Sequence, residues 1–288
     1  MTTMTHLENF GFLAVRGKDA MKFLQGYTTC DLLDITPERS GLGGICNIQG
    51  RMIASFRIVA TADGFLLRMG RSLIPVVSEF LQKYIVFSKA SLADVSDTLH
   101  CYGVIGPVDG FPTTRLGTVR IGECQIIRVS DTDRFEVYDA TPPAFAEVDN
   151  QPWLAAEIDD GLAWVSDATA GEYIPQMFDY HRTGGIDFDK GCYLGQEIVA
   201  RMQYRGSLNR KLRRGQVTDE VAIGELLLAT DTSEKTLGQV VATAGSHFLA
   251  VVQAKDDSLP DCQLADGRAV TLEAISREAS GPVQTNRA

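Results

Sequence analysis

One cysteine in the chain has neighbours that could make it chemically reactive. Cys192 lies in the segment GGIDFDKGCYLGQEIVARMQYRG, residues 184–206, between Gly191 and Gly195 and two residues after Lys190. The two glycines permit backbone conformations with positive φ, and a helix is predicted to begin directly after the second one. A helix N-terminus and a nearby cation both favour the thiolate form of a cysteine. Cys192 is therefore a candidate reactive thiol, and the alternative is a thiol packed in a tight turn.

The remaining sequence lacks the motifs of the common enzyme classes. It contains no Ser-His-Asp order, no phosphate-binding loop and no H-E-x-x-H, so hydrolase, nucleotide-triphosphatase and metalloprotease interpretations have no support. The six cysteines are scattered, without C-x-x-C or Cys/His clusters at zinc spacing. We therefore predict no resident metal, and no iron–sulfur cluster bound permanently by this chain alone.

Composition and charge narrow the class of protein. The 288 residues are 44% hydrophobic, which suits two or three packed units. A net charge of −10 argues against a general attraction to nucleic acid. Between Arg201 and Thr218, however, six cations occur without an acid, which favours either a local polyanion site or a solvated linker. We find no membrane-spanning stretch and no secretory signal, so we expect a cytoplasmic protein.

The elements that must position Cys192 follow from the periodicity of the apolar residues. Helices are predicted over 17–25 and, with Pro75 in its first turn, over about 73–84. A strand pair over 52–60 and 65–69 is joined by a turn. This order indicates an α+β fold. From about Gly206 onward the pattern changes to short strands separated by turns, which predicts a small all-β unit. The other predicted strands cover 101–105, 124–129, 135–138, 239–243, 248–253 and 269–275.

The segment around Cys192 resembles the signature of a known family. Residues 190–197, KGCYLGQE, match the K-G-C-Y-x-G-Q-E motif of the YgfZ branch of the aminomethyltransferase-like proteins. The motif residues beside the cysteine are Lys190, Gly191, Tyr193, Gly195, Gln196 and Glu197. Further matches are the K-Y-x-V-F-S-K segment at 83–89, the L-Q-G-x-x-T-x-D segment at 24–31, Y-I-P-Q at 173–176 and the glycine pair at 184–185.

The resemblance implies a fold and a domain order. Members of this family have a three-lobed α+β arrangement around a folate channel, with a small C-terminal β-barrel. Transferred to this chain, the resemblance implies a discontinuous first lobe over 1–16 and 97–206 that carries the motif. It also implies a second α+β lobe over 17–96 and a barrel over 207–288.

Two positions bear on the activity that the resemblance implies. The aminomethyltransferases carry a catalytic aspartate after N-x-x-G-G-I, but this chain has Ala54 and Ser55 there. Because a proton-transfer group typically contributes about 10²–10⁴-fold, its loss argues against aminomethyl transfer. The pterin-binding carboxylate falls on Asp159, where family members usually have Glu. By the same resemblance, Arg201 is a second candidate folate contact.

The resemblance implies a folate-binding accessory protein that uses tetrahydrofolate or a derivative. It would act through Cys192 in maturing or repairing iron–sulfur enzymes, including those that methylthiolate tRNA, and would bind these clients transiently. Three alternatives remain open: a folate-dependent one-carbon transferase on an unknown substrate, a tRNA-binding adaptor that uses the basic run, and an adaptor in which Cys192 is vestigial. The negative net charge of the chain indicates that direct tRNA binding is not strong.

Overall fold

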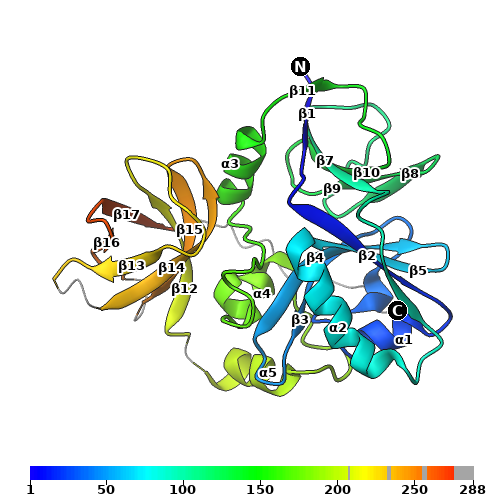
Figure 1. Ribbon diagram of the computed structural model, residues 1–288, viewed down its shortest axis with the longest axis horizontal. Coiled ribbons are helices and arrows are strands. Elements are labelled where there is room, and N and C mark those ends of the chain that lie inside the picture. Colours follow the sequence, from blue (N-terminus) through cyan, green and yellow to red (C-terminus); the bar gives the residue numbers. More distant parts are fainter. Residues whose placement is uncertain (207, 232–234, 255–257, 276–288) are drawn as a thin grey trace.

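The computed structural model describes residues 1–206, 208–231, 235–254 and 258–275, and these form an α+β fold. Two β-sheets and their helices make up the larger part, and a barrel lies to one side of them (Figure 1). Helices α3 (Gln151–Asp159), α4 (Tyr180–Thr183) and α5 (Gln196–Arg205) are drawn between the sheets and the barrel or beneath them. Within the described ranges, no helix is long and apolar enough to cross a membrane.

A five-stranded sheet and two helices build the part of the molecule nearest Cys192. The strand order is β3 (Gly41–Cys46), β4 (Met52–Thr61), β5 (Gly64–Gly70), β2 (Phe10–Arg16) and β6 (Ser91–Asp94). The predicted hairpin is confirmed, because β4 and β5 pair antiparallel across a short turn. Three short elements also belong to this part of the chain: α1 (Ala20–Gln25) and the 3₁₀ turns η1 (Leu32–Asp34) and η2 (Arg71–Leu73). Helix α1 begins later than the predicted residue 17, since Gly17 has a φ of 117°, which no α-helix accommodates.

Helix α2 (Ile74–Ile85) covers this sheet and is confirmed as an amphipathic helix. Its buried residues are Ile74, Val77, Leu81 and Ile85, which recur every three or four positions and so share one face. Pro75 stands in the first turn, where its missing N–H costs no hydrogen bond.

A six-stranded sheet stands beside the first. Its order is β11 (Ala146–Glu147), β1 (Thr3–His6), β7 (His100–Ile105), β10 (Arg134–Asp139), β9 (Cys124–Arg128) and β8 (Thr118–Ile121). Between β1 and β2 the chain crosses from this sheet to the five-stranded one. Residues 10–16 therefore pair with β5 and β6, although we grouped them with the first lobe. The division into lobes itself stays a prediction.

The predicted all-β unit is a closed six-stranded barrel. Its cyclic order is β12 (Arg210–Gln216), β15 (His247–Gln253), β14 (Thr236–Ala244), β13 (Leu226–Ala229), β16 (Cys262–Leu264) and β17 (Ala269–Ala274). Closure leaves no free sheet edge, which explains how such short strands form a stable unit. Ser207 and residues 276–288, which we assigned to this barrel, lie outside the described residues.

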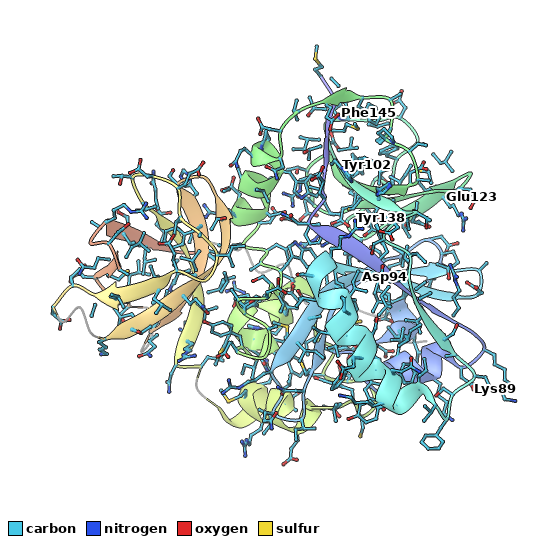
Figure 2. The ribbon with its side chains drawn as sticks, in the orientation of Figure 1. Lys89, Asp94, Tyr102, Glu123, Tyr138 and Phe145 are labelled. Carbon is cyan, nitrogen blue, oxygen red and sulfur yellow. The ribbon has the colours of Figure 1, made fainter. Side chains whose placement is uncertain are left out.

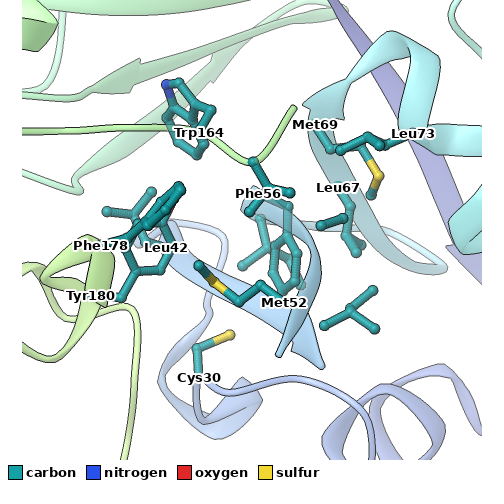
Figure 3. Packing of buried hydrophobic residues seen from close by; sticks show 14 of the residues in the cluster. Cys30, Leu42, Met52, Phe56, Leu67, Met69, Leu73, Trp164, Phe178 and Tyr180 are labelled. Atoms are coloured by element: carbon teal, nitrogen blue, oxygen red, sulfur yellow. The ribbon is translucent and has the colours of Figure 1, made fainter. Parts of the chain in front are cut away.

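The largest apolar cluster fills the space between the five-stranded sheet and the segments that lead to α4. Figure 3 shows Met52, Phe56 and Leu67 from the sheet facing Phe178 and Tyr180 across this core. Cys30 lies at its lower edge and is buried. The core therefore fixes the loop after α1 and the segment before Cys192 against the same sheet.

A buried ionic cluster joins the two sheets. Glu136 of β10 is fully buried and accepts hydrogen bonds from Arg68 of β5 through Nε at 3.2 Å and through Nη2. Arg57 of β4 places its Nε 3.2 Å from the same carboxylate, and the Tyr138 hydroxyl donates to it at 2.6 Å. The Arg68 guanidinium also lies 3.9 Å from the ring centres of Phe10 and Trp164. In Figure 2 Tyr138 stands between the two sheets, where this cluster bridges them.

Candidate functional site

The loop that carries Cys192 presents its thiol to solvent. Cys192 is exposed and free, whereas its neighbour Tyr193 is buried. Two backbone hydrogen bonds hold the loop: Leu194 N donates to Gly26 O at 3.0 Å, and Gln196 N donates to Tyr193 O at 3.1 Å as α5 begins. The thiol therefore sits on an anchored loop just before a helix N-terminus, as predicted.

Lys190 is the main anchor of this loop. Its ammonium is buried and donates to three backbone carbonyls, one at the end of α1 and two in the loop that follows it: Gln25 O at 3.0 Å, Thr28 O at 2.7 Å and Cys30 O at 2.7 Å. Burial lowers the pKa of Lys190, and the nearby Cys30, Asp31 and Asp187 oppose that effect. We expected Lys190 to favour the Cys192 thiolate. Its hydrogen bonds give it a structural role in joining the motif loop to α1.

We expect Lys190→Met to lower the free energy of unfolding by about 1–3 kcal/mol, because buried carbonyls lose their donor. The effect should concentrate locally, so hydrogen exchange should speed up at residues 187–196 before it does in the barrel. Lys18→Met is the matched control, since Lys18 is exposed. Unchanged exchange at 187–196 in folded Lys190→Met would show that the ammonium does not hold the loop.

The two glycines of the motif have different roles. Gly195 has a φ of 83°, and a Cβ there would lie 2.5 Å from Asn47 O and 3.0 Å from Gly50 Cα. The motif loop can therefore approach the β3–β4 turn only because this residue is glycine. Gly191 is not among the residues with positive φ, and a Cβ there would meet open space. The expected left-handed freedom is used at Gly195 and not at Gly191.

The early T-x-D segment and the late motif meet in space. The Thr29 hydroxyl donates to Gly185 O at 2.5 Å, and Asp187 N donates to Thr29 O at 2.9 Å. Asp187 in turn accepts from the backbone N–H groups of Asp189 and Lys190 at 2.7 and 2.9 Å, which turns the chain toward Cys192. Segments about 160 residues apart thus form one unit around the candidate site.

The Y-I-P-Q segment links the site to the barrel. Gln176 lies in the 3₁₀ turn η3 (Pro175–Phe178) and donates through Nε2 to Val199 O of α5 at 2.6 Å. The Tyr173 hydroxyl donates to Gln239 Oε1 of β14 at 2.8 Å. One short segment thus contacts both α5 and β14.

A cavity of about 710 Å³ opens beside this segment, and its volume suits a small-molecule ligand. Its apolar wall comes from Ile174 and Met177 and from Ile198 and Met202 of α5. Its polar lining is Asn47, Gln49, Arg51, Glu172, Asn209 and Arg210. A second cavity of about 370 Å³ shares Glu172 and Arg210 and reaches along the barrel. Cys192 is three residues from the N-cap of α5, whose next turns line the larger cavity.

The sequence-predicted folate contacts lie apart from this cavity. Asp159 ends α3 with its side chain exposed, and its carboxylate is 3.5 Å from Arg214 Nη2. Arg201 is exposed on α5 and lines neither cavity. Gln196 is half-buried and Glu197 is exposed, both in the first turn of α5. Their roles toward a ligand stay predictions.

The basic run of the sequence does not form one surface. Arg213 is buried in the barrel wall, while Arg214 donates to Asp159 O at 2.8 Å. Arg210 lines both cavities, whereas Arg201 stands on the exposed side of α5. Sequence reasoning included Arg210 as one cation of the basic run, and it missed Arg51 as a ligand candidate. Only the fold brings these two residues to one cavity.

Ala54 and Ser55, which the sequence resemblance aligns with the transferase carboxylate, are both fully buried in β4. The Ser55 hydroxyl accepts from Val165 N at 2.8 Å, so it belongs to the packing of the core. Within the described ranges, no three His, Cys, Asp or Glu side chains are grouped so that they could hold a metal ion.

Comparison with known proteins places the chain in a family. It is 34% identical over 98% of its length to the tRNA-modifying protein YgfZ of Vibrio atlanticus, and covers 86% of that protein. It is 30% identical over 92% of its length to the YgfZ protein of Colwellia psychrerythraea, and covers 89% of it. The chain belongs to the YgfZ family. No protein-family model matches it.

The fold of this YgfZ family member is that of an aminomethyltransferase. The glycine cleavage system aminomethyltransferase T of Bartonella henselae superposes with a TM-score of 0.74, over 95% of this chain and 85% of that one. The two are only 12% identical, so the likeness concerns the fold alone. The predicted α+β aminomethyltransferase-like fold with a C-terminal barrel is thereby confirmed.

Proposed function

We propose that this YgfZ family member is a folate-binding accessory protein for the maturation or repair of iron–sulfur enzymes, including tRNA-methylthiolating ones. In this proposal Cys192 is the side chain that reacts with the client or transiently ligates its cluster. The observation that carries the proposal is an exposed thiol on an anchored loop, three residues before the N-cap of the helix that lines a ligand-sized cavity. The protein would work in the cytoplasm.

The chemistry of the larger cavity fits a reduced folate. A folate combines a flat ring system with one or more glutamate carboxylates. The apolar wall of the cavity would contact the ring, while Arg51 and Arg210 would pair with carboxylates in charge-assisted hydrogen bonds. Tetrahydrofolate or a derivative would supply one-carbon chemistry when bound, and these residues would bind and orient it.

A one-carbon transferase is the weaker candidate. In the five-stranded sheet, the positions that carry the carboxylate of the transferases hold Ala54 and Ser55, and the Ser55 hydroxyl is engaged with Val165 N. No side chain there can hold a proton for the substrate amine. The buried alanine and serine support an accessory role over aminomethyl transfer.

We expect a folate with several glutamates to bind about fivefold or more tightly than the monoglutamate, because a charge-assisted contact contributes about 1.5–3 kcal/mol when desolvated and less when exposed. Calorimetry at 50 and 200 mM salt measures both affinities, and the advantage should shrink at the higher salt. Arg210→Gln should remove most of the advantage.

Two further variants provide a control and a test of the alternative site. Lys18→Gln removes an exposed cation remote in sequence and should leave both affinities unchanged. Arg201→Gln tests the family-based assignment, since Arg201 does not line the cavity. Loss of folate binding in Arg201→Gln, with full binding in Arg210→Gln, would move the folate site away from this cavity. Undetectable tetrahydrofolate binding at millimolar ligand would refute folate binding altogether.

A further inference from the structure

Helix α2 carries a second apolar stripe that the core covers only in part, since Phe80 is half-buried against the core. Val76, Phe80, Tyr84 and Phe87 follow one another at intervals of four, four and three residues, which places them along one side of the helix and its C-terminal turn. Val76 and Tyr84 are exposed, and Phe87 is 95% exposed. The exposed part of this stripe is available for contact with another molecule, because the opposite face of the helix already fills the core.

The stripe continues onto the loop after α1 through aromatic contacts. The ring centres of Tyr84 and Tyr27 lie 5.0 Å apart, those of Phe80 and Tyr84 lie 5.6 Å apart, and those of Tyr27 and Phe23 lie 5.0 Å apart. We call Tyr27, Val76, Phe80, Tyr84, Val86 and Phe87 the α2 aromatic surface. Val86 adds a 64% exposed aliphatic side chain to it.

The backbone that presents Phe87 is held in place. Ser88 N donates to Ile85 O at 2.8 Å, and Lys89 N donates to the Asp19 carboxylate at 2.7 Å. Asp19 N donates back to Lys89 O at 3.4 Å. A fixed backbone on either side of Phe87 lowers the entropy cost of ordering this turn on binding.

The α2 aromatic surface adjoins the Cys192 loop. Tyr27 lies between Gly26, which accepts from Leu194 N, and Thr28, which accepts from the Lys190 ammonium at 2.7 Å. A partner seated on this surface would therefore lie close to the loop that carries the exposed thiol. The position of the surface beside the Cys192 loop therefore agrees with a role in bringing a client to Cys192.

Exposed cations outnumber the acids around the surface, although the net charge of the protein is −10. Lys22, Lys83 and Lys89 are exposed on its elements. Glu79 lies 3.4 Å from Lys83, and the Asp19 carboxylate accepts from Lys89 N at 2.7 Å. Figure 2 shows Lys89 at the outer edge of the molecule, beyond the end of α2. Exposed cations at the rim steer an acidic partner and exclude a basic one.

We propose that the α2 aromatic surface docks the client protein, through a client surface that has an apolar pocket ringed by acidic side chains. This proposal rests on the proposed function and names the contact by which a client would reach Cys192. A protein fits better than single-stranded RNA, because Val76 and Val86 cannot stack on bases but can fill an apolar pocket.

The test compares Val86→Ser/Phe87→Ser with wild type in a strain that lacks the gene, by growth and by the level of methylthiolated tRNA. We expect the rescuing activity of the double variant to be about tenfold lower than that of wild type, as is usual when interface anchors are removed. Its melting temperature, tetrahydrofolate affinity and Cys192 labelling rate should stay unchanged, because both side chains are exposed. Ile121→Ser is the matched control, since Ile121 is 54% exposed on β8 of the other sheet.

Charge variants test the acidic partner. Lys89→Glu should weaken rescue, and Lys235→Glu, at an exposed lysine of the barrel, should not. Full rescue by the double variant overturns the proposal, and so does a loss of rescue that accompanies lost folate affinity. The proposal would also be overturned if Phe87 proved to be needed for another interaction. Such interactions are salt-sensitive tRNA binding, binding to phosphatidylglycerol vesicles and self-association, and each would identify a different occupant of the surface.

Cys192→Ala, tested in parallel, separates this proposal from the proposed function. Rescue by Cys192→Ala together with failure of Val86→Ser/Phe87→Ser would refute the reactive cysteine and support the docking surface. Failure of Cys192→Ala together with full rescue by the double variant would support the reactive cysteine and overturn the docking surface.

Discussion

Limiting iodoacetamide at pH 7 is expected to modify Cys192 at least tenfold faster than any other cysteine of the native protein. Cys192 is exposed, whereas Cys30, Cys46, Cys101 and Cys262 are buried. Burial raises the pKa of Cys30 to about 11 and that of Cys46 to about 12. A thiol whose pKa rises from 9.0 to about 11 carries about a hundredfold less thiolate at pH 7, and the thiolate is the form that reacts.

Cys124 is the informative internal control, because it is only half-buried. Burial raises its pKa to about 11, and Asp139 adds to the effect. It should therefore label slowly despite its partial exposure. Mass spectrometry of tryptic peptides measures all six rates in one sample. If Cys192 labelled no faster than Cys124, exposure alone would not make it the reactive cysteine.

Glu136→Gln should destabilise the protein by about 3–5 kcal/mol, the usual cost of removing one partner from a buried ion pair. The substitution leaves Arg57 and Arg68 buried with no carboxylate between them. Urea unfolding measures the loss. Glu79→Gln is the matched control: its exposed pair with Lys83 should be worth less than about 1 kcal/mol.

The same cluster predicts a pH dependence. The pKa of Glu136 is lowered from 4.5 to about 2: burial raises it, but Arg57, Arg68 and the Tyr138 hydroxyl lower it by more. A carboxylate with a lowered pKa in the folded state stabilises the fold above pH 4.5, and this stability is lost as the pH falls toward 2. Glu136→Gln should therefore flatten the acid side of the stability profile. An unchanged acid limb would show that Glu136 does not control acid unfolding.

Local sequence patterns predicted much of the fold. Helix α2 and the β4–β5 hairpin were predictable because an element with one buried face has apolar residues at regular intervals, and these intervals are visible in the sequence. The change to short strands near Gly206 likewise predicted the barrel that begins at Arg210. The ionic cluster was not predictable, since Arg68 and Glu136 are 68 residues apart and each could equally face solvent on its strand.

The candidate site shows the same division between local and long-range information. The eight-residue motif located Cys192, and its exposure on an anchored loop agrees with a reactive role. The partners of the motif came only from the fold: Lys190 binds carbonyls more than 160 residues earlier in the chain. The same holds for the cavity, because Arg51 and Arg210 belong to the β3–β4 turn and the barrel.

We expect Cys192 to be required for function although it is not required for folding. The direct measurement is the level of methylthiolated tRNA in a strain lacking the gene, complemented with wild type or with Cys192→Ala. We expect Cys192→Ala to restore less than about a tenth of the wild-type level. Its melting temperature and tetrahydrofolate affinity should stay those of wild type, because the thiol is exposed and lines neither cavity. Full restoration by folded Cys192→Ala would contradict the account and make the cysteine a structural residue of its loop.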